Sequence, residues 1–266
     1  MDDGTVAGYL RRISVSPPVH ADAAGFRVLH RAHQISVPFE NLSIHLGEPI
    51  SLDTGDLVSK IVDRRRGGFC YELNGTFGFL LEALGAQVAR VSARVYSDGT
   101  RLGPPFDHMA LVVRLPDGTG PWLADVGFGR HSVYPLLLDS RAEQDDPAGC
   151  FLLVEAPLGD IDVLKNGEPQ YRVELRERSL ADFVPTCWWQ QTSPLSHFTQ
   201  DTICSLLTED GRVSISGRTL IRTSNGSRSE QQLTSDEALL SAYRDHFGVA
   251  LDRVPAKAAG VSRGHA

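Results

Sequence analysis

The stretch RRRGGFCYELNGTFGFLLEALG, residues 64–85, decides the fold more than any other part of the sequence. From Cys70 onward its large apolar residues recur at the spacing of one helical face; they are Leu73, Phe77, Leu80, Leu81 and Leu84. That spacing predicts an amphipathic helix over 70–84. Gly85 follows, at the position where a glycine commonly ends a helix. We therefore expect Cys70 to open a helix that packs against the core.

The segments on either side of this helix predict an α+β protein. The order is helices first, then antiparallel strands, then a smaller mixed segment, which fits α+β better than alternating βαβ units. A polar, acidic stretch at 139–149 predicts a surface loop. Apolar spacing predicts helices at 23–34 (behind an Asp22 cap), 56–62 and 236–247, and strands at 89–95, 109–115, 122–126, 150–155, 171–175 and 202–207.

Composition narrows the class of protein. The 266 residues include 26 Lys and Arg against 33 Asp and Glu, a net charge of −7, which argues against a binder of nucleic acid. No apolar run approaches the roughly 18 residues of a membrane span, and the acidic start does not resemble a signal peptide. The cysteines and histidines show no metal-ligand spacing, so we expect no metal. We expect a cytoplasmic protein with reduced thiols and no membrane partner; the sequence does not indicate its oligomeric state.

Cys70 is the candidate nucleophile. A helix N-terminus carries unpaired N–H groups and a partial positive charge, and the three arginines 64–66 lie just upstream. Both effects favour a thiolate over a thiol. Gly67 and Gly68 would let backbone approach a substrate closely, or turn tightly into the helix. The alternative for Cys70 is a small buried hydrophobe. The other three cysteines, Cys150, Cys187 and Cys204, have no such setting, and we interpret them as core or surface residues.

A nucleophilic thiol needs a histidine base and a group that orients it. His108 begins one predicted strand and Asp125 ends the next, across a turn at 117–118. That turn sets a register in which His108 lies opposite Gly127, so Asp125 shares its face one diagonal step away. A carboxylate among apolar neighbours must be paired, and His108 is the obvious partner.

These segments together resemble the arylamine N-acetyltransferase family. The resemblance runs from about residue 9 to 250, and RGGFCYELN at 66–74 is its most specific part. The other matching segments are YLRRI at 9–13, VPFENL at 37–42, HMALV at 108–112, DVGFG at 125–129 and, more weakly, SPLSHF at 193–198.

The resemblance implies three parts and a cysteine-protease-like catalytic core. These are a helical bundle carrying the nucleophile (1–85), an antiparallel β-barrel carrying the histidine and aspartate (86–196), and an α/β lid with a short flexible tail (197–266). It implies a triad of Cys70, His108 and Asp125, the same residues that the local argument selects. It also implies acetyl-CoA as donor, and arylamines, hydrazines or arylhydroxylamines as acceptors.

The resemblance further implies roles for residues around the triad. Gly127 and Gly129 would lie beside the acyl and pantetheine chain of the donor. Arg12, Glu40 and Arg66 would form a structural salt-bridge cluster below the site. The aromatic acceptor pocket would be lined by Phe39, Val95, Phe128 and Phe198.

Three other functions remain open from the sequence. One branch of the family closes macrolactam rings on polyketide chains, and nothing in the residues excludes it. A thiol hydrolase or transglutaminase-like enzyme would use the same triad. The third is a small-molecule binding protein without enzymatic activity. In such a protein the helix-terminal thiol and the acid beside the histidine would be a coincidence. Asp107 departs from the family pattern and makes the cleft beside the histidine more acidic, while the short lid leaves the acceptor and the mode of CoA binding open.

Overall fold

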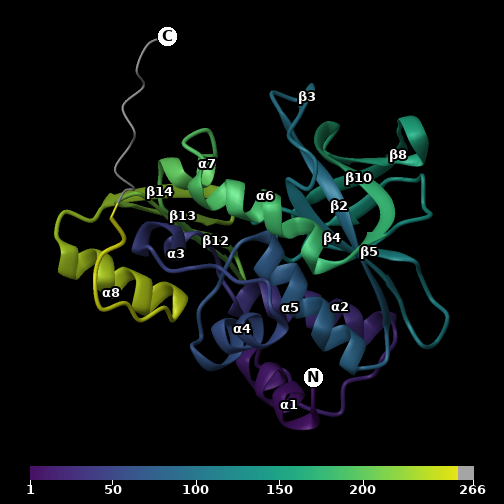
Figure 1. Ribbon diagram of the computed structural model, residues 1–266, viewed down its shortest axis with the longest axis horizontal. Coiled ribbons are helices and arrows are strands. Elements are labelled where there is room, and N and C mark those ends of the chain that lie inside the picture. Colours follow the sequence, from purple (N-terminus) through teal and green to yellow (C-terminus); the bar gives the residue numbers. More distant parts are fainter. Residues whose placement is uncertain (257–266) are drawn as a thin grey trace.

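The computed structural model describes residues 1–256, so the flexible tail expected from Ala256 to Ala266 lies almost wholly outside the described residues. Two sheets and a group of helices make up the described part (Figure 1). The N-terminal helices lie at the bottom of Figure 1, the larger sheet at the upper right, and the smaller sheet with the last helix at the left. This is the mixture of helices and antiparallel strands that the sequence predicts.

The central helix has almost its predicted bounds. It is α5, and Gly85 just beyond it has a φ of +94°, the left-handed conformation that glycine adopts at helix ends. The predicted Asp22 cap is also present, because its Oδ1 accepts from the Gly25 N–H at 2.8 Å. The helices are α1 (Asp3–Arg12), α2 (Ala23–Ser36), α3 (Leu42–Leu46), α4 (Thr54–Val58), α5 (Cys70–Ala83), α6 (Leu180–Thr192), α7 (His197–Gln200) and α8 (Asp236–Phe247), with a π-helical turn at Ser59–Asp63 and a 3₁₀ turn at Pro157–Gly159.

The larger sheet carries the hairpin on which His108 and Asp125 lie. Its strand order is β6-β5-β4-β2-β10-β9-β8-β7, with β3 paired to β2, and it curls toward a closed barrel. Leu111 pairs with Ala124 across the β4–β5 hairpin, which confirms the register that the turn predicts. The strands are β2 (Gln87–Ser97), β3 (Arg101–Leu102), β4 (His108–Arg114), β5 (Trp122–Ala124), β6 (Leu136–Leu137), β7 (Gln144–Asp146), β8 (Gly149–Glu155), β9 (Ile161–Lys165) and β10 (Glu168–Arg178).

One expectation about this sheet is wrong in part. The segment 139–149 is not only a surface loop, because it contributes the short edge strand β7. The Asp146 side chain holds this segment in place. The two oxygens of its carboxylate accept from the N–H groups of Val133 and Tyr134, both at 2.9 Å. A polar, acidic stretch can therefore be fixed in place when its carboxylate accepts from otherwise unpaired backbone donors.

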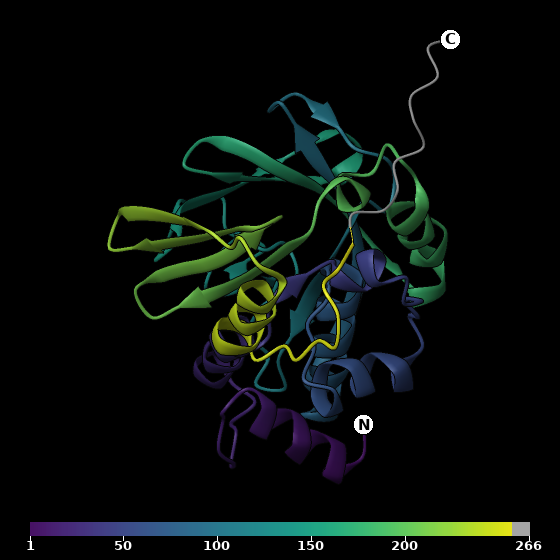
Figure 2. The same cartoon turned by 90° about the vertical axis from the view of Figure 1, so that its left-hand side faces the viewer.

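The smaller sheet combines one strand from the N-terminal part of the chain with four strands from the C-terminal part. Its four C-terminal strands form a meander, and α8 packs below them (Figure 2). Its edge strand comes from the N-terminal part, where Phe39 pairs with Ser205. Leu42 and Leu46 of α3 share one apolar cluster with α8. The strands are β1 (Phe39–Glu40), β11 (Ile203–Thr208), β12 (Gly211–Ser216), β13 (Thr219–Ser224) and β14 (Ser227–Gln232).

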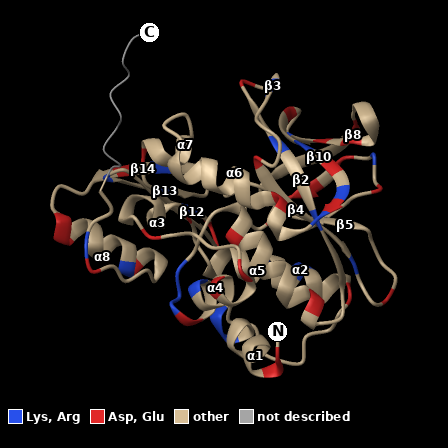
Figure 3. Ribbon diagram, viewed as in Figure 1, with Lys and Arg blue, Asp and Glu red and all other residues tan. Residues whose placement is uncertain are grey.

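The helix α6 covers the N-terminal end of α5. Its buried residues Phe183 and Cys187 join the apolar cluster that contains Phe69, Cys70 and Tyr71. Acidic and basic residues are interspersed over the ribbon rather than separated into two halves (Figure 3). No helix among residues 1–256 is long and apolar enough to cross a membrane.

Candidate active site

Cys70 is the first residue of α5, and its side chain is only 3% exposed. The two glycines before it approach the protein's own backbone. A Cβ on Gly67 would lie 1.9 Å from the Pro38 carbonyl oxygen, and one on Gly68 would lie 2.5 Å from the Glu72 carboxylate. The Glu40 N–H donates to the Gly68 carbonyl at 2.8 Å. Gly67 and Gly68 are therefore required for packing the loop that precedes Cys70, the nucleophile loop, against β1.

His108 and Asp125 are in contact across the hairpin, as the register predicts. His108 Nε2 and Asp125 Oδ2 are 2.7 Å apart, and the two side chains are almost wholly buried. The other carboxylate oxygen, Oδ1, accepts from Asn74 Nδ2 at 2.9 Å and from the Gly127 N–H at 3.0 Å. Since Asn74 lies one helical turn after Cys70, the helix that presents the thiol also fixes the aspartate.

The Cys70 thiol lies close enough to the His108 side chain to affect its protonation. Nε2 faces Asp125, so Nδ1 is the ring nitrogen left for the sulfur. Burial would lower the pKa of His108, but Asp125 and Cys70 outweigh it and raise the pKa to about 10. Burial would raise the pKa of Asp125, but His108 outweighs it and holds that pKa well below its usual range. The pair is therefore an imidazolium and a carboxylate at neutral pH.

Two aromatic rings hold the imidazole in place. The rings of Phe128 and Tyr171 each lie 5.2 Å from the His108 ring, centre to centre. Tyr171 is fully buried, and burial together with the nearby Asp125 charge raises its pKa well above the usual value. Neither Asn74 nor Tyr171 was singled out from the sequence, although Asn74 lies within the most specific matching segment.

One of the three arginines before Cys70 is paired with carboxylates. Arg66 forms ion pairs with Glu40 at 2.9 Å and Glu48 at 3.2 Å, so carboxylates already offset its charge. The expected cluster of Arg12, Glu40 and Arg66 is also only partly right. Arg12 donates instead to backbone carbonyls, including that of Ile61 at 3.1 Å. A buried guanidinium has five N–H donors, and backbone carbonyl groups can accept from them as a carboxylate would.

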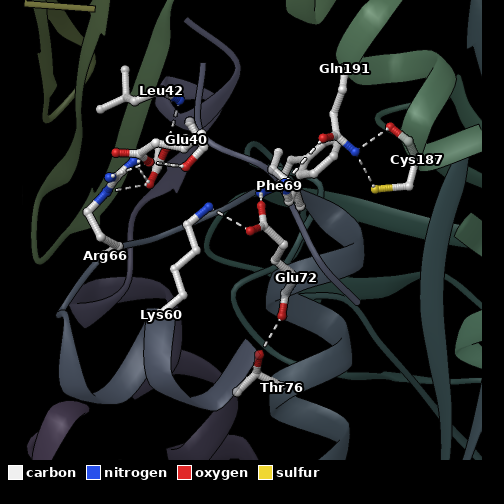
Figure 4. Close-up of polar contacts among 12 residues, drawn as sticks. Glu40, Leu42, Lys60, Arg66, Phe69, Glu72, Thr76, Cys187 and Gln191 are labelled. Carbon is white, nitrogen blue, oxygen red and sulfur yellow. Dashed lines mark hydrogen bonds and ion pairs between the residues drawn. The ribbon is translucent and has the colours of Figure 1, made fainter. Parts of the chain in front are cut away.

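A second buried ion pair, which the sequence analysis missed, supports the start of α5 (Figure 4). Lys60 Nζ lies 2.6 Å from Glu72 Oε1, and both side chains are nearly inaccessible. Glu72 Oε2 accepts from the Phe69 N–H at 3.2 Å, directly before Cys70. Burial raises the pKa of Glu72, although Lys60 favours its ionised form. The pair therefore ties the nucleophile loop to the π-helical turn at Ser59–Asp63.

Lys60→Met should lower the free energy of unfolding by about 3–5 kcal/mol, because Glu72 would remain as a buried charge without its partner. Chemical denaturation at neutral pH measures this loss. The double variant Lys60→Met/Glu72→Gln should recover part of it, since the amide still accepts from Phe69. As a control, Arg228→Gln removes an exposed pair with Glu230 and should cost less than about 1 kcal/mol. Equal losses in the Lys60 and Arg228 variants would contradict this role of the pair.

The candidate acceptor and donor residues do not line one cavity. Phe39, Phe128 and Gly129 line a cavity of about 340 Å³ against β11–β13. Phe198 packs on the Phe39 ring at 6.1 Å. Val95 lines a different cavity of about 550 Å³, with Asp107 and His197.

The two glycines of the loop after β5 differ in their surroundings. A Cβ on Gly127 would lie 2.7 Å from Cys70 Cα, so this glycine packs directly against the start of α5. Gly129 has a φ of +90°, and its nearest neighbour is the Phe39 ring. Within residues 1–256 no group of three His, Cys, Asp or Glu side chains could hold a metal ion.

A helix-terminal thiol, a buried imidazole and a carboxylate in one series of contacts is the arrangement of enzymes that transfer or hydrolyse acyl groups through a cysteine. The fold and the geometry therefore favour the class of thiol-dependent acyl-transfer enzymes. A family model described as N-acetyltransferase matches residues 22–255. The arylamine N-acetyltransferase of Mycolicibacterium smegmatis is 34% identical over 92% of this chain and 92% of its own length. That of Escherichia coli K12 is 33% identical over 92% of this chain and 88% of its own length.

Solved structures agree with the sequence relatives. The M. smegmatis arylamine N-acetyl transferase matches with a TM-score of 0.86 and 33% identity, over 94% of this chain and 93% of that one. The Mycobacterium marinum arylamine N-acetyltransferase in complex with CoA matches with a TM-score of 0.83 and 30% identity, over 92% of each chain. The chain belongs to the arylamine N-acetyltransferase family, a family of acyltransferases that use acetyl-CoA. The resemblance inferred from the motifs is thereby confirmed.

Proposed function

We propose that the chain transfers an acetyl group from acetyl-CoA to an arylamine, hydrazine or arylhydroxylamine by a ping-pong reaction. The observation that carries this proposal is the buried His108–Asp125 hydrogen bond beside Cys70, the first residue of α5. It places a nucleophilic sulfur and a proton carrier side by side, so that one can attack the carbonyl carbon and the other can protonate the leaving group. The surrounding core is that of a cysteine-protease-like enzyme in this proposal.

In the first half-reaction the Cys70 thiolate attacks the thioester carbonyl carbon of acetyl-CoA. The carbon–sulfur bond to CoA breaks, and His108 gives its proton to the departing sulfur. Backbone N–H groups in the first turn of α5 would stabilise the negative oxygen. In the second half-reaction the amine nitrogen attacks the acetyl-cysteine, His108 takes the proton of that nitrogen, and the Cys70 thiolate is released. Asp125 holds the imidazole and stabilises its charged form throughout.

The proposal also assigns the residues that line the acceptor site, the glycines beside the donor and the three parts of the chain. Phe39, Phe128 and Phe198 form aromatic walls for the acceptor, and Val95 of β2 is the fourth lining residue. Gly127 and Gly129 place the loop after β5 beside the acyl and pantetheine chain. In this proposal the chain has three parts. Residues 1–85 form the helical bundle that carries the nucleophile, residues 86–196 form the barrel that carries the histidine and aspartate, and residues 197–266 form the lid.

Incubation with acetyl-CoA alone should release about one CoA per active site as a burst, since a covalent acyl-enzyme outlives CoA departure when no amine is present. Intact-mass measurement should show one added acetyl group, and peptide mapping should place it on Cys70. An added arylamine should then discharge that group into an N-acetylated product.

Two results would overturn this reading. Discharge by water as fast as by amine would establish a thiol hydrolase instead. If no acyl-enzyme forms with any acyl-CoA tested, the donor is not a simple CoA thioester. A carrier-bound polyketide, the substrate of a macrolactam-forming amide synthase, would then be tested next.

A further inference from the structure

The loop that begins at Asp125 is held by side chains at three consecutive positions. Asp125 lies just beyond the paired residues of β5, and its N–H donates to His30 Nε2 at 3.1 Å. The next two N–H groups, those of Val126 and Gly127, donate to Asn74 Oδ1 at 2.9 Å and to Asp125 Oδ1 at 3.0 Å. Two helices, α2 and α5, therefore hold the backbone that presents the carboxylate of the candidate triad.

His30 reaches this loop from the buried side of α2. Its side chain is inaccessible to solvent, and its ring contacts those of Phe26 and Phe77 edge to face, at 6.3 and 6.0 Å between centres. Phe77 belongs to α5, the helix that begins at Cys70. These aromatic contacts restrict the orientation in which the imidazole presents its two nitrogens.

The hydrogen bonds determine which ring nitrogen carries the proton. A backbone N–H can only donate, so Nε2, which accepts from Asp125, must be the unprotonated nitrogen. Nδ1 then carries the proton and donates to the Val133 carbonyl at 2.9 Å. Gln34 Nε2 donates to the same carbonyl at 3.2 Å and to that of Ser132 at 3.0 Å. His30 thus joins the start of the loop to the segment that follows it.

The surroundings keep this ring neutral. Burial lowers the pKa of His30 to about 4, although the Val133 carbonyl and the carboxylates of Asp125 and Asp146 favour the charged form. Arg27, on the preceding turn of α2, also disfavours the charge. A charged imidazole would direct an N–H at the N–H of Asp125, so only the neutral ring can accept from the loop.

We infer that His30 is a positioning residue for the candidate triad, which holds the backbone of Asp125 so that its carboxylate stays against His108. This inference rests on the proposed function, since it assigns His30 a part in that reaction. Without His30 the Asp125 N–H would be a buried donor with no partner, and the loop would shift toward another acceptor. The contact between His108 and Asp125 is a single hydrogen bond of 2.7 Å, so a small shift weakens it. A displacement of about 1 Å can lower a catalytic rate by roughly 10²-fold.

The alternative is that His30 only fills the core beside α5, and His33 provides the comparison. His33 lies on the same helix, is equally buried, and its ring also contacts that of Phe77, at 5.3 Å. Its Nδ1 lies 2.8 Å from the hydroxyl of Tyr9 on α1, rather than at the loop that carries Asp125. The two histidines therefore have similar packing and differ in the group that they hold.

The test compares His30→Leu with His33→Leu and with His30→Gln, whose amide oxygen can accept in place of Nε2. With acetyl-CoA and an arylamine, His30→Leu should lower kcat by roughly 10- to 100-fold with little change in either KM. His33→Leu should keep a kcat near the wild-type value, and His30→Gln should recover most of the loss. Denaturant unfolding checks that each variant is folded under the assay conditions.

The titration of His108 separates positioning from packing. In the wild-type chain Asp125 and Cys70 outweigh burial and raise the pKa of His108 to about 10. NMR of the imidazole without substrate should show that His108 loses its proton at lower pH in His30→Leu, because the carboxylate is no longer held against the ring. His33→Leu and His30→Gln should keep the wild-type midpoint. Equal losses of kcat in the two leucine variants, with an unchanged His108 midpoint, would reduce His30 to core packing.

The tautomer of His30 provides a measurement that needs no variant. The nitrogen resonances of its imidazole in the wild-type chain should show a protonated Nδ1 and an unprotonated Nε2 at neutral pH. A proton on Nε2 would exclude the bond from the Asp125 N–H and overturn the inference, even if no leucine variant folds. Because neither NMR measurement involves substrate, failure of the proposed acyl transfer would appear separately, as a wild-type chain that shows this tautomer but forms no N-acetylated product.

Discussion

Cys70→Ala should abolish acyl transfer while the chain still folds. Without the sulfur no acyl-enzyme can form, and His108 has no thiolate beside it. Removal of the nucleophile from a comparable triad lowers kcat by roughly 10⁶-fold. Initial rates of acetyl-CoA and arylamine turnover measure this loss, and denaturant unfolding checks the fold. Alanine keeps the start of α5 intact because it removes only the sulfur.

The other cysteines supply the controls for this prediction. Burial raises the pKa of Cys187 and of Cys204, so both thiols stay protonated at neutral pH. Cys150 lies on β8, which β10 and β9 separate from β2 in the order of the sheet. Alanine at each of these three positions should keep most of the activity. A comparable loss at one of them, with unchanged stability, would move the nucleophile to that position.

The sequence predicts the helix start at Cys70 and the contact between His108 and Asp125 because their determinants are local. The helix start at Cys70 follows from apolar spacing, and the 117–118 turn fixes which residues of β4 and β5 face each other. A two-residue period leaves one choice of face once the register is set. His108 and Asp125 are therefore placed by a short hairpin, with no need to know the rest of the fold.

What the sequence does not predict depends on contacts between distant segments. Lys60 and Glu72 look like ordinary solvent-facing charges until α6 covers them, and Arg12 finds its carbonyl partners on another helix. The joining of Phe39 to β11 closes a separation of more than 160 residues. Such pairings are set by packing rather than by local propensity.

The helix α6 was missed for a different reason. Pro185 lies inside this helix, where the sequence argues against one, and its bulky residues lie on several faces, so apolar periodicity is weak. A local signal did exist, because Ser179 and Asp182 form a capping box at its start. Recognising that box would have indicated a helix over the nucleophile end of α5.

Asp125→Asn should lower the rate of acyl transfer by on the order of 10⁴-fold, the loss seen when the aspartate of a serine-protease triad becomes an amide. Asp125 Oδ1 accepts from both Asn74 and the Gly127 N–H, so the asparagine oxygen would take that side. Its NH₂ group would then face His108 Nε2 and donate to it. The imidazole would hold its proton on Nδ1, toward Cys70, and could not accept the proton of the thiol. Turnover with acetyl-CoA and an arylamine measures the loss.

The pH profile separates this role from a structural one. In the native site Asp125 and Cys70 keep the pKa of His108 near 10 against the effect of burial. Without the carboxylate charge, burial lowers that pKa, so the imidazolium is lost at a lower pH and the alkaline limb of kcat/KM moves toward neutrality. Asp107→Asn is the matched control, because that carboxylate neighbours His108 in sequence but accepts from Gln190 at 2.7 Å. An Asp125→Asn protein that folds, turns over at the wild-type rate and keeps the alkaline limb in place would show that Asp125 only supports the hairpin.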